Sequence, residues 1–240
     1  MAALTGPLGD VLDLLAPPRC LACRRRAPLP WCPRCASRVV VLHGGCPRCA
    51  APRGRGHPCW PAGVPVAGTI AVYDYRGPVA RAIVTAKVRG AWAGWAPLAD
   101  ALGEAVAAAD PQVDAVTWIT TPTRRARRRD GDHARRLAAV SATALGVPLV
   151  CLLAADEQPG GGDLYRARSS LPGSRLLLVD DVITTGATAL RAATALRQAG
   201  ADAVHLAVVA RAGSHPLAGD ATAATSSRSV PDGSTPTARS

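Results

Sequence analysis

The chain has 240 residues, enough for one sizeable domain and a smaller unit, and 48% of them are apolar, enough for a core. It carries a formal net charge of +11, and no apolar run reaches the ~18 to 20 residues of a membrane-spanning helix. The N-terminus lacks the basic start and apolar stretch of a secretory signal. We therefore expect a cytoplasmic protein without a membrane span, whose cysteines are thiols rather than disulfides.

A cluster of cysteines comes first along the chain, in a segment with few periodic apolar positions. Paired C-x-x-C turns place thiolates at the spacing of a tetrahedral zinc site, so metal would replace the missing core of residues 1–61. Two complete pairs predict one zinc site. The three remaining cysteines before residue 60 lack a fourth cysteine, and His57 is the nearest candidate for that ligand. The sequence therefore leaves open whether the module binds one zinc ion or two. The predicted ligands are Cys20, Cys23, Cys32 and Cys35 for a first site, and Cys46, Cys49, His57 and Cys59 for a second. Cys151 is expected to be a buried, small apolar residue.

Strand-like and helix-like stretches alternate from residue 62 to residue 212, which predicts an α/β domain with a parallel, doubly wound sheet. The expected strands cover residues 64–75, 113–120, 147–153, 175–181 and 203–210, and the expected helices cover 78–88, 97–109, 132–145 and 187–200. The polar, glycine-rich segment 154–174 is expected to be a mobile loop, and residues 213–240 a disordered tail.

A run of arginines follows the strand predicted over 113–120. Arginine forks onto phosphate oxygens, so a nucleic-acid backbone is one interpretation and a solvated basic face is the other. No aromatic residue interleaves the run, so base stacking is not indicated. The candidate nucleic-acid contacts are Arg124, Arg125, Arg127, Arg128 and Arg129.

The stretch LLLVDDVITTGAT (176–188) joins an apolar strand, two acids and a polar turn before a helix. Asp180 and Asp181 lie at the carboxyl end of the strand, where parallel sheets bind ligands, and can accept hydrogen bonds from vicinal ribose hydroxyls. The turn offers backbone N–H groups at a helix start, a phosphate site. Its residues are Thr184, Thr185, Gly186, Ala187 and Thr188. The implied ligand is a ribose 5-phosphate. A Walker B strand and a receiver domain share the apolar-then-acidic pattern, but each requires a lysine elsewhere in the sequence, and Lys87 is at neither position. A purely structural turn is the remaining alternative.

This stretch resembles the signature of type I phosphoribosyltransferases, which bind phosphoribosyl pyrophosphate (PRPP). With the cysteine module, AVYDYRGPVARAIVTAKVRG, TTPTRRARRRDGDHARRLA and their order, the chain is similar to the ComF family of competence-associated, phosphoribosyltransferase-like proteins over about residues 18–211. The resemblance implies that Asp180 and Asp181 approach the ribose, that Mg²⁺ accompanies the pyrophosphate, and that some of the arginines meet it. It also implies a pyrophosphate loop made of Thr120, Thr121, Pro122 and Thr123.

Two departures from the family pattern concern turnover. Many relatives carry an Arg-Gly-Phe-Asn-Gln run where this chain has Arg129 to His133, and of the usual spaced polar residues in the next loop only Gln158, Arg166 and Arg168 remain. An altered closing loop affects turnover more than binding, and we assign no catalytic residue.

The expected function is that of a ComF-like protein which binds PRPP and Mg²⁺ and is linked to DNA uptake and the handling of single-stranded DNA. Its expected partners are single-stranded DNA and proteins of DNA uptake or recombination. The alternative is an active phosphoribosyltransferase that transfers phosphoribosyl from PRPP to a base or an amine. The sequence leaves homo-oligomerisation open.

Overall fold

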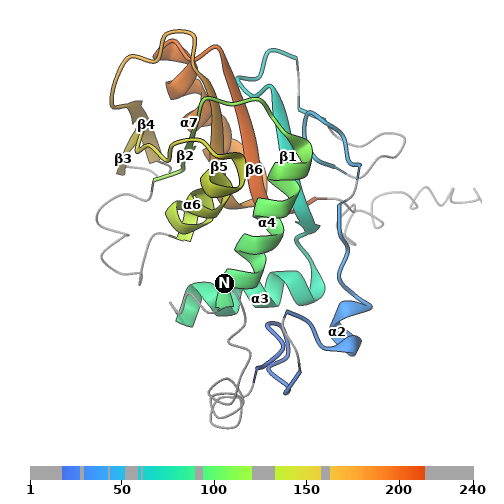
Figure 1. The fold of residues 1–240 in the computed structure, drawn as a ribbon. Helices are drawn as coiled ribbons and strands as arrows, with labels where there is room; N and C mark the ends of the chain where they lie inside the picture. The colour runs from blue at the N-terminus through green and yellow to red at the C-terminus, as the bar shows by residue number, and fades with distance from the viewer. Residues whose placement is uncertain are drawn as a thin grey trace, which may run out of the picture.

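The computed structural model describes residues 18–27, 30–42, 44–51, 59–60, 62–89, 94–120, 133–157 and 163–213. Its helices are α2 (Pro33–Ala36), α3 (Gly77–Arg89), α4 (Ala96–Ala109), α6 (His133–Leu145) and α7 (Ala187–Gln198) (Figure 1). Its strands are β1 (Gly68–Asp74), β2 (Ala115–Trp118), β3 (Leu153–Glu157), β4 (Asp163–Ala167), β5 (Arg175–Ile183) and β6 (Ala203–Arg211). Among the described residues, no helix has both the length and the apolar character needed to span a membrane.

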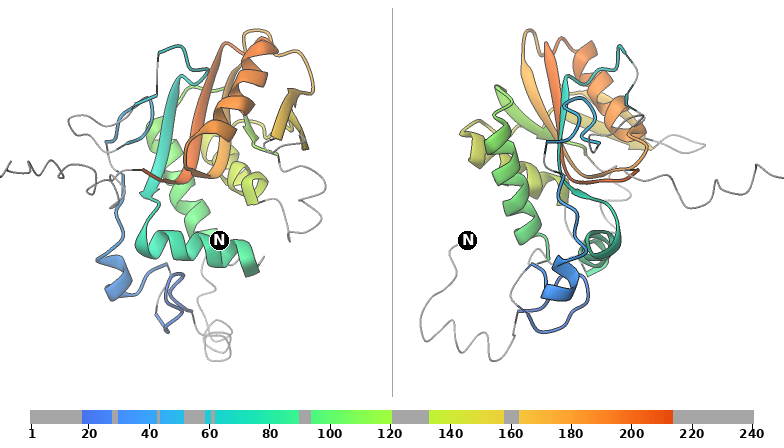
Figure 2. Two further views of the ribbon diagram at one scale, coloured as in Figure 1. Left: turned by 180° about the vertical axis from the view of Figure 1, so that it is seen from behind. Right: turned by 90° about the vertical axis from the view of Figure 1, so that its right-hand side faces the viewer.

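Four parallel strands in the order β1-β6-β5-β2 form the central sheet. Helices α4 and α6 cover one face, while α7 and the β3–β4 pair cover the other (Figures 1 and 2). The apolar run of β5 explains this arrangement: Leu177 and Val179 pack into the core under α4 and α6, and Leu176 and Leu178 into the core under α7. The predicted parallel α/β fold is confirmed.

The segment expected to be a loop, 154–174, instead contains a hairpin. Strands β3 and β4 pair antiparallel, with Ala155 opposite Tyr165. Tyr165 is buried in the core that contains the apolar face of α7, and Ala155 and Ala167 pack against the same core, so these side chains anchor the pair. The side chain of Arg168 donates from Nε to the carbonyl of Leu153 at 3.0 Å and ties the ends of the hairpin together. Gln158 lies outside the described residues.

The strand expected over 147–153 is reduced to an isolated parallel bridge between Leu149 and Val116. The chain leaves the sheet after this bridge because Leu152 and Leu153 are buried in the core on the α7 side. Cys151 is consequently exposed, so its expected burial is wrong.

Part of the cysteine-rich segment lies along the free edge of β1. Val41 forms an antiparallel bridge with Tyr73, and the N–H of Leu42 donates to the carbonyl of Val72 at 2.8 Å. Trp31 packs edge-on against the ring of Tyr73, with centroids 6.1 Å apart. The segment therefore continues the packing of the sheet and does not stand apart from it.

Candidate functional site

A small polar cavity of about 60 Å³ lies where β5 ends and α7 begins, lined by Asp180 and residues 182–189. Gly186 is the N-cap of α7 and has a φ of +81°, a left-handed conformation that favours glycine. Glycine has no side chain that could cap α7, and the N–H of Ala187, the first residue of the helix, donates to Oγ1 of Thr185 at 3.3 Å. The other N–H groups of the first turn point out of the helix start, as in any α-helix. The helix dipole adds positive potential, so the cavity suits a tetrahedral oxyanion.

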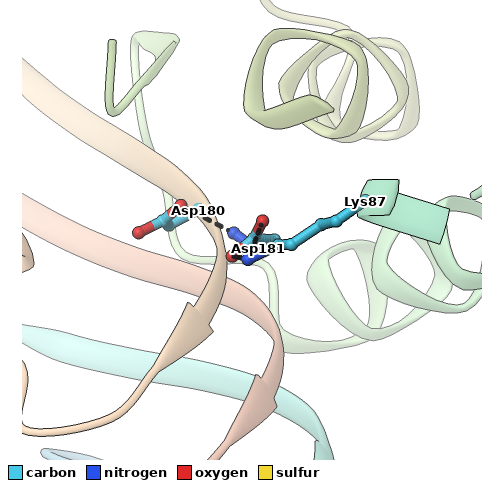
Figure 3. A network of polar contacts seen from close by, with 3 residues as sticks. All are labelled: Lys87, Asp180 and Asp181. Carbon is cyan, nitrogen blue, oxygen red and sulfur yellow. Dashed lines mark hydrogen bonds and ion pairs between the residues drawn. The ribbon is translucent and has the colours of Figure 1, made fainter. Parts of the chain in front are cut away.

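The two acids of β5 point in different directions (Figure 3). Asp180 lines the cavity, whereas the carboxylate of Asp181 accepts from Nζ of Lys87 with both oxygens, at 2.7 and 2.9 Å. The N–H of Asp181 also donates to Oδ1 of Asp180 at 2.8 Å. Successive residues of a strand project to opposite faces, so adjacent carboxylates are separated by the backbone itself. Of the two acids, Asp180 is the one that lines the cavity together with the turn of residues 184–188.

Lys87, near the end of α3, is a residue of this site that sequence reasoning missed. It is the only lysine of the chain and lies 94 residues from Asp181. The sequence did offer a hint of this ion pair: two carboxylates next to a predicted phosphate site need a positive charge nearby. The ammonium group of Lys87 neutralises one of them, so the edge of β5 carries less negative charge than its sequence suggests.

The predicted pyrophosphate loop begins beside these acids. Trp118 is in register with Val179, and the N–H of Ile119 donates to the carbonyl of Val179 at 3.0 Å, so Thr120 lies at the same carboxyl edge of the sheet. Thr120 Oγ1 is buried and has no hydrogen-bond partner among the described residues. The remainder of this loop and the candidate nucleic-acid contacts lie outside the described residues: Thr121, Pro122, Thr123, Arg124, Arg125, Arg127, Arg128 and Arg129.

The helix that follows, α6, carries the end of the basic segment. Arg135 and Arg136 are exposed, and the guanidinium carbon of Arg135 lies 5.9 Å from the ring centroid of Trp118. His133 is buried at the start of α6 and stacks on Trp95, with centroids 4.8 Å apart. These contacts seat the helix start on the sheet domain near the end of β2.

The cysteines gather into two clusters whose geometry fits tetrahedral thiolate coordination. The thiols within each cluster lie within 4.8 Å of one another. A zinc ion with bonds of about 2.3 Å to sulfur has sulfur–sulfur edges of roughly 3.8 Å. Two measured pairs match this edge: 3.6 Å in the first cluster, Cys20, Cys23, Cys32 and Cys35, and 3.8 Å in the second, Cys46, Cys49 and Cys59. The predicted fourth ligand of the second cluster, His57, lies outside the described residues.

Each cluster begins with the same kind of turn. The N–H of Arg24 donates to the carbonyl of Cys20 at 3.0 Å, and the N–H of Ala50 donates to the carbonyl of Cys46 at 2.7 Å. Both donors have a positive φ, 65° and 55°, which is uncommon outside glycine. The repeated turn indicates two zinc knuckles of one design.

Burial, together with the neighbouring cysteines, raises the pKa of the Cys35 thiol to about 12. Four bare thiolates therefore do not coexist in the first cluster, and a divalent cation would supply the positive charge that lets all four act as ligands.

The sequence matches two domain families. Residues 105–232 match the phosphoribosyl transferase domain and residues 11–62 the double zinc ribbon domain, which confirms the predicted zinc-binding module. The orotate phosphoribosyltransferase of Pyrococcus abyssi (strain GE5 / Orsay) is 42% identical over 72 residues, covering 28% of this chain and 39% of that protein. The chain thus spans about two fifths of the length of this curated relative.

Among solved structures, the chain is similar to the purine phosphoribosyltransferase from Pyrococcus horikoshii Ot3, with 19% identity and a TM-score of 0.39 over 50% of this chain and 75% of that one. It is also similar to the orotate phosphoribosyltransferase from Aeropyrum pernix, with 27% identity and a TM-score of 0.34 over 50% of this chain and 60% of that one. Scores of this size describe partial overlap, so the family assignment rests on the domain match.

Proposed function

Because the chain belongs to the phosphoribosyl transferase domain family, matched over more than half of its residues, we propose that the edge of β5 binds PRPP. The observation that carries this proposal is the oxyanion-sized cavity at the start of α7, with Asp180 on its wall. In this proposal Thr184 to Thr188 hold the 5-phosphate through backbone N–H groups and hydroxyls, and Asp180 accepts from the ribose hydroxyls.

Groups around the cavity would interact with the other charged parts of the ligand. Lys87 compensates the charge of Asp181, so a strongly anionic ligand meets less negative charge at this edge than two carboxylates alone would give. The hydroxyl of Thr120, which finds no partner within the described part of the chain, supports a pyrophosphate loop that begins at this residue. Mg²⁺, when bound, neutralises pyrophosphate and retains several of its waters; oxygen donors described nearby are the carboxylate of Asp180 and the threonine hydroxyls.

We propose further that this is a ComF-type protein of the cytoplasm that handles single-stranded DNA during DNA uptake, with partners among uptake or recombination proteins. The support is the order of a double zinc ribbon before a phosphoribosyltransferase domain, together with the net charge of +11. Exposed Arg135 and Arg136 extend the arginine run onto α6. Contacts of this kind bind phosphates without reading sequence.

The second candidate function is transfer of phosphoribosyl to a base or an amine. The likeness to an orotate phosphoribosyltransferase favours it. In such a reaction the acceptor nitrogen forms a bond to the anomeric carbon as the bond from that carbon to pyrophosphate breaks, and the nitrogen loses its proton. The described residues near the site would act by positioning and charge stabilisation, without a covalent nucleophile.

Calorimetry with PRPP and Mg²⁺ tests the binding site. Wild type should bind, and Asp180→Asn should weaken binding roughly tenfold to a hundredfold, as expected for the loss of hydrogen bonds to a charged group. Asp114→Asn is the matched control, because Asp114 is exposed, pairs with Arg175 and lies at the opposite end of the sheet. Wild type without binding, or equal loss in both variants, would reject the site. Pyrophosphate release in a screen of bases and amines would then decide between the two functions.

A further inference from the structure

Gly186 of the phosphate-binding turn is buried beneath a residue of the cysteine-rich segment. A Cβ atom at Gly186 would lie 3.4 Å from Nε1 and 3.5 Å from Cζ2 of Trp60. The indole is 8% exposed and belongs to the same core as Ile183 and Ala189, which flank the turn on either side. The indole of Trp60 therefore packs directly against the turn. In the sequence, Trp60 directly follows Cys59, whose thiol belongs to the second cluster.

The first half of the second cluster is fixed to the sheet. Its knuckle, residues 46–51, offers the carbonyl of Cys49 to Nε of Arg211 and the carbonyl of Arg48 to the hydroxyl of Thr69 at 2.7 Å. Arg211 ends β6 and Thr69 lies in β1, so the knuckle is held by the two strands farthest from β2. Cys46 and Cys49 thus have a defined position relative to β5 and its turn.

The sulfur of Cys59 approaches this fixed knuckle, and a shared metal ion would join the two. This sulfur lies 3.8 Å from that of Cys46, the separation of two ligands on one tetrahedral metal. Without a cation, the charges of neighbouring thiolates repel one another. A bound metal would therefore fix the position of Cys59, and with it that of the adjacent indole of Trp60.

We propose that the second cysteine cluster is part of the ligand site: its metal holds Trp60 against Gly186 and so presets the phosphate-binding turn. Trp60 is a positioning residue, since it acts through the backbone of the turn. The identity of the ligand rests on the proposed function, in which the turn takes the 5-phosphate of PRPP. Because coupling between two sites is reciprocal, PRPP should tighten metal binding at this cluster by the same factor by which the metal tightens PRPP binding.

The first cluster provides an internal control. Its thiols pack with Ala22, Ala27 and Trp31, and this group contains no residue of the phosphate-binding turn. Both clusters offer cysteine thiols on the same kind of turn, so a general requirement for zinc in folding would affect both of them. A role in ligand binding applies to the second cluster only.

The experiment compares Cys46→Ser, Cys20→Ser and Trp60→Phe in the full chain, with zinc measured by elemental analysis. Each cysteine variant should lose one equivalent of zinc. Cys46→Ser should lower PRPP affinity tenfold or more and speed amide hydrogen exchange over residues 183–190, whereas Cys20→Ser should leave both unchanged. Trp60→Phe should keep its zinc and still bind PRPP more weakly. Equal PRPP affinities in wild type and Cys46→Ser would overturn the inference and leave the PRPP site standing.

A measurement on the wild-type protein remains informative if Cys46→Ser does not fold. Zinc release to a colorimetric chelator should have two phases, and PRPP with excess Mg²⁺ should slow one of them. The PRPP-sensitive phase should persist in Cys20→Ser. In Asp180→Asn, the same slowing should require roughly tenfold to a hundredfold more PRPP, with unchanged zinc content. The coupling would be refuted if PRPP slowed both phases of zinc release equally. It would also be refuted if PRPP slowed neither phase while calorimetry showed that PRPP binds. If wild type binds no PRPP, the proposed function fails and this inference fails with it.

Discussion

The ion pair between Lys87 and Asp181 permits a quantitative test of how the edge of β5 is charged. At 2.7 Å, Coulomb attraction at an effective dielectric constant of 20 would reach about 6 kcal/mol, before desolvation removes most of it. Exposed pairs contribute roughly 0.2–1 kcal/mol, and removing one partner of a buried pair costs about 3–5 kcal/mol. The side chain of Lys87 is 34% exposed and that of Asp181 is 15% exposed. We therefore expect Lys87→Met to lower the free energy of unfolding by about 2 kcal/mol, and we expect a coupling energy of about 1–2 kcal/mol between the two residues.

Urea denaturation of wild type, Lys87→Met, Asp181→Asn and the double variant gives this coupling directly. The zinc concentration must be equal in all four, because bound metal adds to the measured stability. Lys87→Met should also weaken PRPP binding, since an uncompensated carboxylate repels the phosphates, and Asp181→Asn should restore part of it in the double variant. A coupling below about 0.5 kcal/mol, within the error of such cycles, would refute the ion pair as a feature of the protein in solution.

Three other perturbations are predicted. Gly186→Ala should destabilise by roughly 1–2 kcal/mol in urea denaturation, because a non-glycine residue is strained at positive φ, and should weaken PRPP binding in calorimetry. Burial lowers the pKa of His205 from its ordinary 6.5, so as the pH falls the unfolded chain takes up the proton before the folded chain does. The free energy of unfolding should therefore decrease as the pH drops below 6.5. This decrease should be less steep in His205→Gln. Replacing Arg127, Arg128 and Arg129 with alanine should flatten the salt dependence of single-stranded DNA binding, measured by fluorescence anisotropy; the expected log-log slope is roughly −0.7 per neutralised phosphate, and an unchanged slope would place the DNA elsewhere.

Local sequence patterns predicted the elements whose stability is local or strongly periodic. The apolar run of β5, the polar turn and the amphipathic α7 follow one another as expected, because strand and helix periods are visible within a dozen residues. Paired cysteines predicted a metal module for the same reason: ligand spacing is encoded over three residues. Hairpin β3–β4 was not visible, since its formation depends on burying Tyr165 under a helix that follows later in the chain.

The site contacts that sequence reasoning missed are all long-range. Nothing in the neighbourhood of Trp60 indicates that it lies under Gly186, and Lys87 meets Asp181 only because α3 lies at the end of β5. Another omission was avoidable: Asp180 and Asp181 are neighbours on a strand, and strand geometry alone directs them to opposite faces. Sequence motifs identified the groups at this site, and tertiary packing decides which of them face the same ligand.

Lys87 also makes the protein unusually easy to label. It is the only lysine among 240 residues and its side chain is 34% exposed, so amine-directed reagents have one side-chain target besides the terminal α-amine. Reductive methylation with ¹³C-formaldehyde keeps the positive charge and would give one NMR reporter at the edge of β5. The same position would accept a photo-crosslinker within reach of whatever occupies that edge. A proteome-wide lysine-reactivity experiment on cells containing this protein would thus read the state of its candidate site from a single peptide.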